Sequence, residues 1–137
     1  MRLGRASAYA LLATLFLADQ SARGAVSVNE IAAASGVPVE YLRKILQLLT
    51  RAKLVHSERG RRGGFRLLRK LNNITILQVV EAIEGPITED SVFGESVLGG
   101  THVAAHQALD SWRRQMSRHF RDYLAETNLE SLLQVPA

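Results

Sequence analysis

The sequence predicts a mainly α-helical fold with one small β-hairpin, that is, a winged helix-turn-helix followed by a long C-terminal helix. Three features of the 137 residues lead to this prediction. Two short helical segments meet at a glycine, two strand-like runs flank a turn rich in glycine and arginine, and a late apolar stripe repeats at helical spacing. We divide the chain into a winged helix-turn-helix over residues 1–86, a glycine-containing loop over 87–101, and a helix with a C-terminal tail over 102–137.

The first helix is expected over residues 6–18, which are dense in alanine and leucine and have a high helix propensity. We expect it to be buried. Its apolar run, residues 9–18, is too short to cross a bilayer, and the N-terminus lacks the cleavage pattern of a secreted precursor. The prediction is a cytoplasmic protein without a membrane partner. The chain has no cysteine, which excludes a disulfide framework, a thiolate metal site and a cysteine nucleophile.

The next two helices form the predicted helix-turn-helix. Ser27 and Glu30 have the spacing of a capping box, which satisfies backbone N–H groups at the start of a helix. Gly36 can adopt the left-handed conformation that ends this short helix, and Pro38 suits the first turn of the next one. Two helices joined by three or four residues that include a glycine are typical of a helix-turn-helix.

The second of these helices, about residues 38–52, has two faces. Its apolar stripe, which must pack against the rest of the domain, consists of Leu42, Ile45, Leu46 and Leu49. The other face carries long hydrogen-bonding side chains of the kind that reach base edges and phosphates in a major groove. The residues of this helix predicted to contact DNA are Val39, Glu40, Tyr41, Arg43, Lys44, Gln47 and Arg51. Taken alone, such a helix is more often simply solvated, so the segment that follows it decides the interpretation.

A β-hairpin is predicted directly after this helix. Residues 54–57 and 65–68 are strand-like, and the turn between them holds three arginines and three glycines. Glycine lets the backbone approach another surface closely, while arginine offers charge and forked donors to phosphate or to a narrow minor groove. The residues of this turn predicted to contact DNA are Arg59, Gly60, Arg61, Arg62, Gly63 and Gly64. A hairpin in this position is the wing of a winged helix.

The charge of the chain is divided between its two halves. Residues 1–70 hold 13 Lys and Arg against 4 Asp and Glu, whereas residues 71–137 hold 4 against 9. The net charge of +4 therefore combines a basic half of +9 with an acidic half of −5. Such a basic half is the electrostatic footprint of a nucleic-acid surface. Binding would weaken steeply with salt, because each neutralised phosphate releases counterions.

Four stretches of the chain carry a resemblance to known proteins. They are MRLGRASAYALLATLFLA at the N-terminus, VEYLRKILQLLTRAKLV in the helix-turn-helix, ERGRRGGFRL in the wing, and ITILQVVEAIEGPI after it. Together they resemble the Rrf2 family of bacterial transcription regulators, over about residues 1–133, and the wing is the most specific part. The resemblance implies a homodimeric winged-helix protein that binds double-stranded DNA as a repressor or an activator.

The segment after the wing departs from the resembling family. Residues 76–85 form a predicted helix, with Thr75 as its N-cap and Gly85-Pro86 as its end. Residues 87–101 are acidic and punctuated by glycine. In cluster-binding members of the family this region carries three cysteines that hold an iron–sulfur cluster, and this chain has none. Because such clusters are held mainly by thiolates, that sensing chemistry is not carried over, and no cofactor is predicted.

A long helix is predicted from about residue 103 to residue 125. Its large apolar side chains, the predicted dimer interface, are Leu109, Trp112, Met116, Phe120 and Tyr123. Packing on the N-terminal half of the same chain is the alternative. A second copy is favoured, because a two-fold dimer would place two recognition helices on one face of DNA. The other face of the helix, which includes Arg113, Arg114, Arg118 and Arg121, is predicted to face solvent.

Two histidines are the remaining candidate ligands. His102 and His106 are four residues apart, so they would project from one face of a helix and could share a metal. No carboxylate occupies a fixed third position, and pairs of this kind are usually solvated or interfacial. We predict no metal site.

The sequence therefore predicts a sequence-specific transcription regulator, more readily a repressor, that binds a pseudo-palindromic operator as a homodimer. In this mechanism Glu40 accepts from a cytosine amino group or orients Arg43 or Lys44. The alternative is an interaction module in which an unknown effector or partner protein bound near residues 87–106 controls or replaces DNA binding. A winged helix on structured RNA is a further alternative. An enzyme is disfavoured, because no nucleophile with its base, no phosphate-cradling loop and no metal triad stands out in the sequence.

Overall fold

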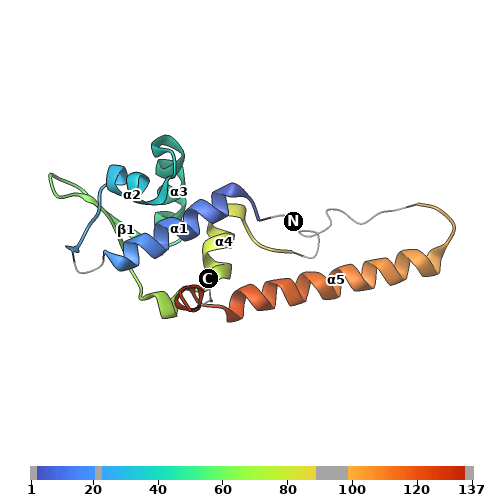
Figure 1. The fold of residues 1–137 in the computed structure, drawn as a ribbon. Coiled ribbons are helices and arrows are strands. Elements are labelled where there is room, and N and C mark those ends of the chain that lie inside the picture. The colour runs from blue at the N-terminus through green and yellow to red at the C-terminus, as the bar shows by residue number, and fades with distance from the viewer. Residues whose placement is uncertain (1–2, 21–22, 89–98, 135–137) are drawn as a thin grey trace.

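The computed structural model describes residues 3–20, 23–88 and 99–134. Its elements are, in chain order, α1 (Arg5–Asp19), α2 (Val28–Ser35), α3 (Val39–Arg51), β1 (Val55–Glu58), β2 (Gly64–Leu67), the 3-10 turn η2 (Leu71–Asn73), α4 (Ile76–Glu84), α5 (Val103–Glu126) and α6 (Leu129–Leu132). The predicted winged helix-turn-helix with a long C-terminal helix is confirmed. Figure 1 shows α1 to α4 and the hairpin as one body, from which α5 projects. Within the described ranges, none of the helices combines the length and the apolar character needed to cross a membrane.

The core lies where α1, α3 and α4 pack on one another. The four residues of the predicted α3 stripe are at most 2% exposed. Burial of a leucine or isoleucine side chain contributes about 1.5–3 kcal/mol, so this stripe fixes the rotation of α3 about its own axis. The opposite face of the helix is consequently held toward solvent.

The first helix is buried on one face only. Its buried residues are Ser7, Ala10, Ala13, Thr14 and Leu17. Leu12, by contrast, is 46% exposed, and Ala8 one turn earlier is exposed as well. The prediction of a buried first helix is wrong for this face, because alanine and leucine surround the whole helix and their composition does not tell the inner face from the outer one.

The start of α1 is capped by a residue from α4. The N-cap residue Gly4 has no side chain to offer, and Glu84 Oε1 accepts hydrogen bonds from Ser7 Oγ at 2.9 Å and from the Gly4 backbone N–H at 3.4 Å. A carboxylate is favoured at this end of a helix, which carries partial positive charge. Glu84 thereby ties the end of α4 to the start of α1.

The hairpin is joined to the chain that enters α2. Strands β1 and β2 pair antiparallel, from Val55 opposite Leu67 to Glu58 opposite Gly64. Phe65 also forms an antiparallel bridge with Val26, and their backbone N–H and C=O groups exchange two hydrogen bonds of 2.8 Å each. This exchange, the Val26–Phe65 bridge, fixes the base of the wing to the helix-turn-helix.

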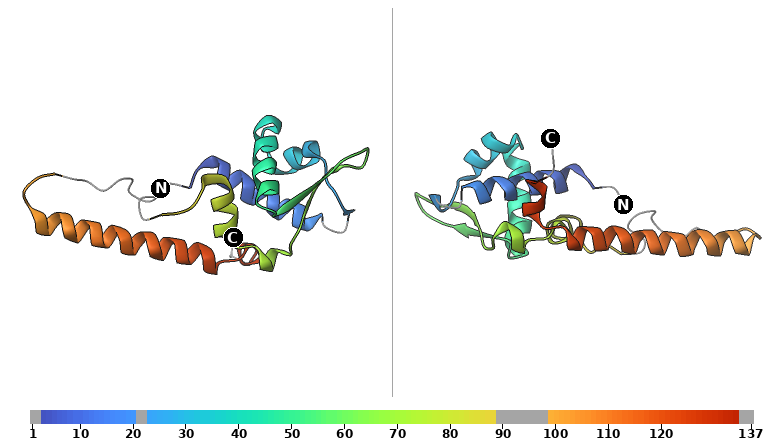
Figure 2. Two further views of the ribbon diagram at one scale, coloured as in Figure 1. Left: turned by 180° about the vertical axis from the view of Figure 1, so that it is seen from behind. Right: turned by 60° about the horizontal axis from the view of Figure 1, so that its bottom comes forward.

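The C-terminal end of α5 returns to the domain, while its N-terminal half extends away from it, as both views in Figure 2 show. Leu124 and Leu129 are buried, and the backbone of the turn between α5 and α6 bonds to the start of α4. The bonds are Ile76 N–H to Thr127 C=O and Leu129 N–H to Ile74 C=O, each 2.9 Å. The C-terminal end of the long helix is therefore anchored to α4 by backbone hydrogen bonds.

The prediction that Arg113 faces solvent is wrong. Arg113 is 7% exposed, and its guanidinium donates to Asp110 Oδ1 from Nε at 3.2 Å and from Nη2 at 2.9 Å. Arg114 donates to the other oxygen of the same carboxylate at 2.7 Å. The sequence pattern predicted that all four arginines share one solvent-facing side of the helix. Arg113 is instead buried, and Asp110 supplies the negative charge that a buried guanidinium requires.

Gly64 allows the Val26–Phe65 bridge, and we expect its replacement by alanine to be strongly destabilising. A Cβ at Gly64 would lie 2.2 Å from the Val26 carbonyl oxygen, and the backbone has φ of +151°. We predict that Gly64→Ala lowers the free energy of unfolding by about 2 kcal/mol or more, because a clash with backbone adds to conformational strain. Urea denaturation followed by circular dichroism measures the change.

Gly36→Ala is the matched control for this variant. Gly36 also has a positive φ, +77°, but a Cβ there meets nothing within 4 Å. Its replacement should cost only the strain of a left-handed residue, about 1–2 kcal/mol. Equal losses in the two variants would show that the close approach at Gly64 is not what the wing depends on.

Candidate nucleic-acid interface

The helix-turn-helix and the hairpin tip lie together on the side of the domain away from α5. Figure 1 and the left view of Figure 2 show α2, α3 and the tip at one edge of the molecule and α5 at the opposite edge. In these views the long helix does not run over α3 or the hairpin tip. This edge of the molecule is the candidate interface.

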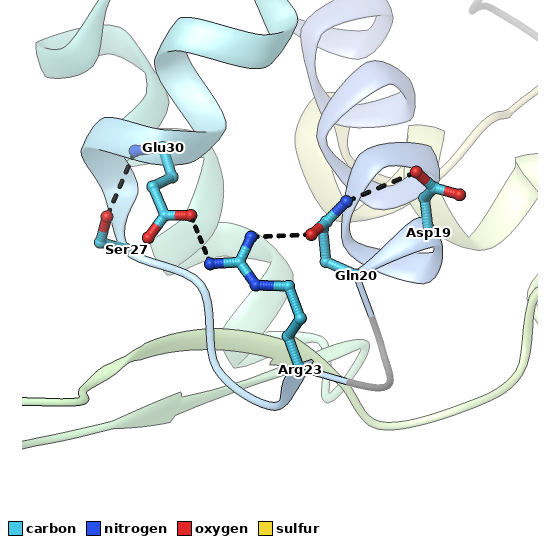
Figure 3. A network of polar contacts seen from close by, with 5 residues as sticks. All are labelled: Asp19, Gln20, Arg23, Ser27 and Glu30. Atoms are coloured by element: carbon cyan, nitrogen blue, oxygen red, sulfur yellow. Dashed lines mark hydrogen bonds and ion pairs between the residues drawn. The ribbon is translucent and has the colours of Figure 1, made fainter.

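The entrance to α2 is held by a chain of polar contacts (Figure 3). Arg23 donates to Gln20 Oε1 at 2.8 Å and to Glu30 Oε2 at 2.9 Å, so it joins the end of α1 to the first turn of α2. Ser27 Oγ accepts from the Glu30 backbone N–H at 3.2 Å. The capping box predicted for Ser27 and Glu30 is half formed, because the Glu30 carboxylate pairs with Arg23 instead of returning to Ser27.

The turn between α2 and α3 follows the predicted glycine. Gly36 adopts the left-handed conformation, with φ of +77° and ψ of +8°, and its N–H bonds to the Ala32 carbonyl. Pro38 is the N-cap of α3, with φ of −58° and ψ of +135°, one position before the first turn for which the sequence suggested it. Its carbonyl accepts from the Leu42 N–H at 2.9 Å and begins the helix.

The polar face of α3 is exposed along its length. The exposed residues from the predicted set are Glu40, Arg43, Lys44, Gln47 and Arg51. Glu40 Oε1 lies 3.7 Å from Arg43 Nε, and both side chains are more than half exposed. An exposed pair of this length contributes little to stability. The pair does place the Glu40 carboxylate beside the Arg43 guanidinium. Glu40 therefore restricts the positions that Arg43 can take.

Two predicted residues of α3 lie off the polar face. Val39 is half-buried. Tyr41 is 44% exposed, and its ring makes an edge-to-face contact with Tyr9 of α1, with ring centroids 5.5 Å apart. Such aromatic pairs add about 0.5–1.5 kcal/mol to the burial of their rings. The structure thus gives Tyr41 a packing role at the flank of α3, which the spacing of the sequence did not indicate.

Lys53 allows the chain to change direction between the end of α3 and the first strand of the wing. Lys53 has φ of +61° and is the one non-glycine residue with a positive φ among the described residues. The Lys53 N–H bonds to the Thr50 carbonyl and the Leu54 N–H to the Leu49 carbonyl, each at 3.0 Å. These two bonds form a Schellman motif, which glycine usually completes. Because a lysine and not a glycine occupies this position, the sequence did not predict the motif.

The wing tip presents three arginines from a tight turn. Arg59, Arg61 and Arg62 are exposed, and in the described residues none of them forms an ion pair. The neighbouring carboxylate, Glu58, is engaged by Arg66 across the hairpin instead. The three tip arginines therefore carry charge that the protein does not neutralise.

The glycines of the tip shape this turn. Gly60 has φ of +107°, and its carbonyl accepts from the Gly63 N–H at 3.0 Å. A Cβ at Gly63 would lie 2.4 Å from the Glu58 carbonyl oxygen. The backbone is thus closed on itself too tightly for a side chain at that position, and the arginines are displayed on a compact loop.

The predicted interface of α5 divides into exposed and half-buried residues. Leu109, Trp112 and Tyr123 are 53%, 49% and 66% exposed. Met116 and Phe120 are half-buried, and Phe120 packs against the core of its own chain. The stripe therefore contains one residue, Phe120, that packs within the chain, and three residues that are about half exposed or more.

The two histidines of the same region serve the start of α5. His102 Nδ1 accepts from the Ala105 backbone N–H at 3.0 Å and so acts as the N-cap, while His106 Nδ1 contacts the His102 carbonyl at 3.1 Å. In the ranges that the structure describes, no group of three or more His, Cys, Asp or Glu side chains could hold a metal ion.

Comparisons with known proteins agree with this geometry. The Rrf2 family, described as "Iron-dependent Transcriptional regulator", matches residues 3–135. A Mycobacterium tuberculosis protein whose name describes an HTH-type transcriptional regulator is 34% identical over 131 residues, which cover 94% of this chain and 79% of that protein. The HTH-type transcriptional regulator IscR of Pectobacterium atrosepticum is 31% identical over 134 residues, with 97% and 79% covered.

The solved structures agree as well. The structure of CymR, the global cysteine regulator of B. subtilis, superposes with a TM-score of 0.76 at 26% identity, and the match covers 100% of this chain and 99% of that chain. T. potens IscR, at 22% identity and a TM-score of 0.71, shares the fold. The family match spans nearly the whole sequence, and the chain belongs to the Rrf2 family of DNA-binding transcription regulators.

Proposed function

We propose that this regulator binds a pseudo-palindromic operator as a cytoplasmic homodimer, with α3 in the major groove and the wing on the flanking backbone. The observation that carries the proposal is the polar face of α3, whose long side chains are all exposed while the opposite face is almost completely buried. A helix fixed in rotation by its core presents the same donors at every encounter with DNA. We propose no catalytic activity.

Each α3 side chain has a role suited to its chemistry. Arg43 and Lys44 can bond to guanine O6 and N7, and Gln47 to adenine N6 and N7. Glu40 cannot bind phosphate, and its 3.7 Å contact with Arg43 supports a role in orienting that guanidinium. Arg51, in the last turn, is proposed as a phosphate contact, whereas Tyr41 and Val39 support the helix from its flanks.

The wing supplies affinity rather than sequence reading in this proposal. Three exposed arginines that pair with no carboxylate of the described residues can neutralise phosphates or enter a narrow minor groove. The tight turn at Gly60 and Gly63 brings the backbone close enough for N–H groups to contribute.

A second copy of the chain is proposed to cover the open part of the α5 stripe. Three large apolar side chains that are about half exposed or more recur at helical spacing on α5, and Leu12 on α1 is exposed as well, which supports a partner surface. A two-fold axis would repeat both surfaces and set the spacing of the two recognition helices. We propose residues 1–86 as the DNA-binding part, 87–101 as the loop of the sensor region and 102–137 as the dimerisation part.

Repression is the simpler mode of action, since occupying an operator is enough to exclude other proteins from it. The alternative of control by a ligand or partner near residues 87–106 is supported by one observation, a hollow against α5 that Ile87 and Thr88 help to line. The segment 89–98, in which most of the predicted sensor loop falls, lies outside the described residues.

We predict that Arg43→Ala weakens operator binding by about 1–3 kcal/mol and relaxes the preference at one or two positions of each half-site. The reason is the loss of a bidentate contact with a base edge. Selection of duplex sites from a random pool, followed by fluorescence anisotropy on the selected site and its single-base variants, measures both effects. Unchanged base preference in a folded Arg43→Ala protein would contradict the assignment of α3 as the reading helix.

Arg61→Ala should weaken all duplexes alike. The arginine is assigned to the phosphate backbone, so its loss should lower the slope of log K against log salt by roughly one unit without changing the preferred sequence. Binding titrations at several salt concentrations give this slope. Arg114→Gln is the control, because that guanidinium already pairs with Asp110 on α5, and it should leave the slope unchanged.

Trp112→Asp should disrupt the dimer and, with it, tight operator binding. A carboxylate at the centre of an apolar interface removes a hot-spot side chain, and we expect the dimer dissociation constant to rise at least about thirtyfold, or about 2 kcal/mol. Sedimentation equilibrium measures it. Gln107→Asp introduces the same charge at an exposed α5 position off the stripe and should leave the dimer intact. A wild-type chain that is monomeric at micromolar concentration would remove the dimer from the proposal.

A further inference from the structure

A pair of tyrosines joins the first turn of α3 to α1. Tyr41 is the third residue of α3, and Tyr9 lies in the second turn of α1. Their rings meet edge to face, with centroids 5.5 Å apart. In a helix-turn-helix the N-terminal residues of the second helix contact the base edges. Tyr9 therefore lies beside the part of α3 that reads bases in the proposed complex.

Both tyrosines have part of their surface in water. Tyr41 is 44% exposed, and Tyr9 is half-buried against the core. A tyrosine at such a position packs its apolar ring on the protein and keeps its polar hydroxyl at the surface. In the described parts of the chain no hydrogen bond engages either hydroxyl. Both hydroxyls are therefore able to donate to a molecule that approaches this flank.

An arginine lies on the same side of α1. Arg5 is exposed and precedes Tyr9 by four residues, so the two side chains project from one side of the helix. The turn that carries Arg5 is held by Glu84, whose Oε1 accepts from the Gly4 backbone N–H and from Ser7 Oγ. The backbone of α1 is consequently fixed at the point from which Arg5 extends.

The dimensions of DNA relate this flank to a phosphate strand. The major groove is about 12 Å wide, and a helix with its side chains has a diameter of about 10–12 Å. The backbone that borders the groove therefore meets the sides of an inserted helix. Helical spacing places Tyr41 between the buried stripe and the exposed polar face of α3, which is such a side.

We propose that Tyr9, Tyr41 and Arg5 contact the phosphate backbone of duplex DNA at one border of the major groove. Tyrosine hydroxyls and arginine side chains are common donors to phosphate oxygens. Phosphate contacts fix the orientation of a protein on the duplex without reading its sequence. This contact rests on the proposed function, and it adds α1 to the surface that α3 and the wing form.

The first test removes the two hydroxyls and keeps the rings. The double variant Tyr9→Phe, Tyr41→Phe should bind the selected operator and an unrelated duplex about fivefold more weakly, because hydrogen bonds to phosphate are lost. Fluorescence anisotropy measures both affinities. The midpoint of urea denaturation should equal that of the wild type, since the ring contact remains. Wild-type affinity for both duplexes in the folded variant would overturn the proposal.

The second test separates charge from hydrogen bonding. Arg5→Gln should lower the slope of log K against log salt by roughly one unit, because one fewer phosphate is neutralised. The tyrosine double variant should keep the wild-type slope, since a neutral hydroxyl releases no counterion. Arg114→Gln, on α5, is again the control for the loss of a positive charge. An unchanged slope in Arg5→Gln would exclude Arg5 from the contact.

The third test distinguishes direct contact from an indirect effect of the tyrosines on α3. A neutral methylphosphonate replaces one phosphate of the operator at a time. At one position on the border of the groove, this replacement should weaken the wild type several-fold and the tyrosine double variant much less, because the variant has already lost that contact. Independent effects of the variant and the methylphosphonate at every position would overturn direct contact.

The outcomes separate this contact from the proposed function. A wild-type protein that selects an operator, with variants that bind it equally well, would retain the proposed function and exclude the contact. A wild-type protein that binds no duplex would contradict both.

Discussion

The Val26–Phe65 bridge is the contact on which the interface depends. Two main-chain hydrogen bonds join the chain just before α2 to the strand that leaves the wing tip. The helix-turn-helix and the wing are consecutive in sequence, and this bridge adds a backbone contact between the wing and the entrance to α2. Because the contact is between backbones, it requires Gly64, whose missing side chain leaves room for the Val26 carbonyl. The Val26–Phe65 bridge thereby holds α2, α3 and the hairpin together as one surface.

The long helix raises a different physical problem, since its N-terminal half extends away from the body that α1 to α4 form. Ion pairs within the helix stabilise part of it. The Asp110 carboxylate pairs with the buried guanidinium of Arg113 and with the more exposed guanidinium of Arg114. The same helix also carries exposed apolar side chains, Leu109, Trp112 and Tyr123, and the exposed cations Arg118 and Arg121. A helix of 24 residues held by its last turns behaves as a lever attached to α4. Whatever contacts its outer part can therefore act on the DNA-binding domain at that attachment.

The local signals of the sequence carried most of the fold. The apolar spacing of α3, the glycine after α2 and the Thr75 cap before α4 each act within a few residues, and the structure has them where the sequence indicated. What could not be predicted depends on contacts between distant residues. Glu84 caps α1 across the domain, and Tyr41 turns aside to Tyr9. Lys53 adopts a left-handed conformation that is more usual for glycine, and two backbone hydrogen bonds at the end of α3 accompany it.

The tip of the wing has one more property that follows from its construction. Its position is set by backbone hydrogen bonds and by glycines, whereas Arg59, Arg61 and Arg62 are exposed and form no ion pair with the described residues. Substitutions at these three positions are consequently almost free of cost to the native state. In the proposed mode of binding, evolution can therefore adjust the affinity for DNA at this loop, one substitution at a time, while the core and α3 stay as they are.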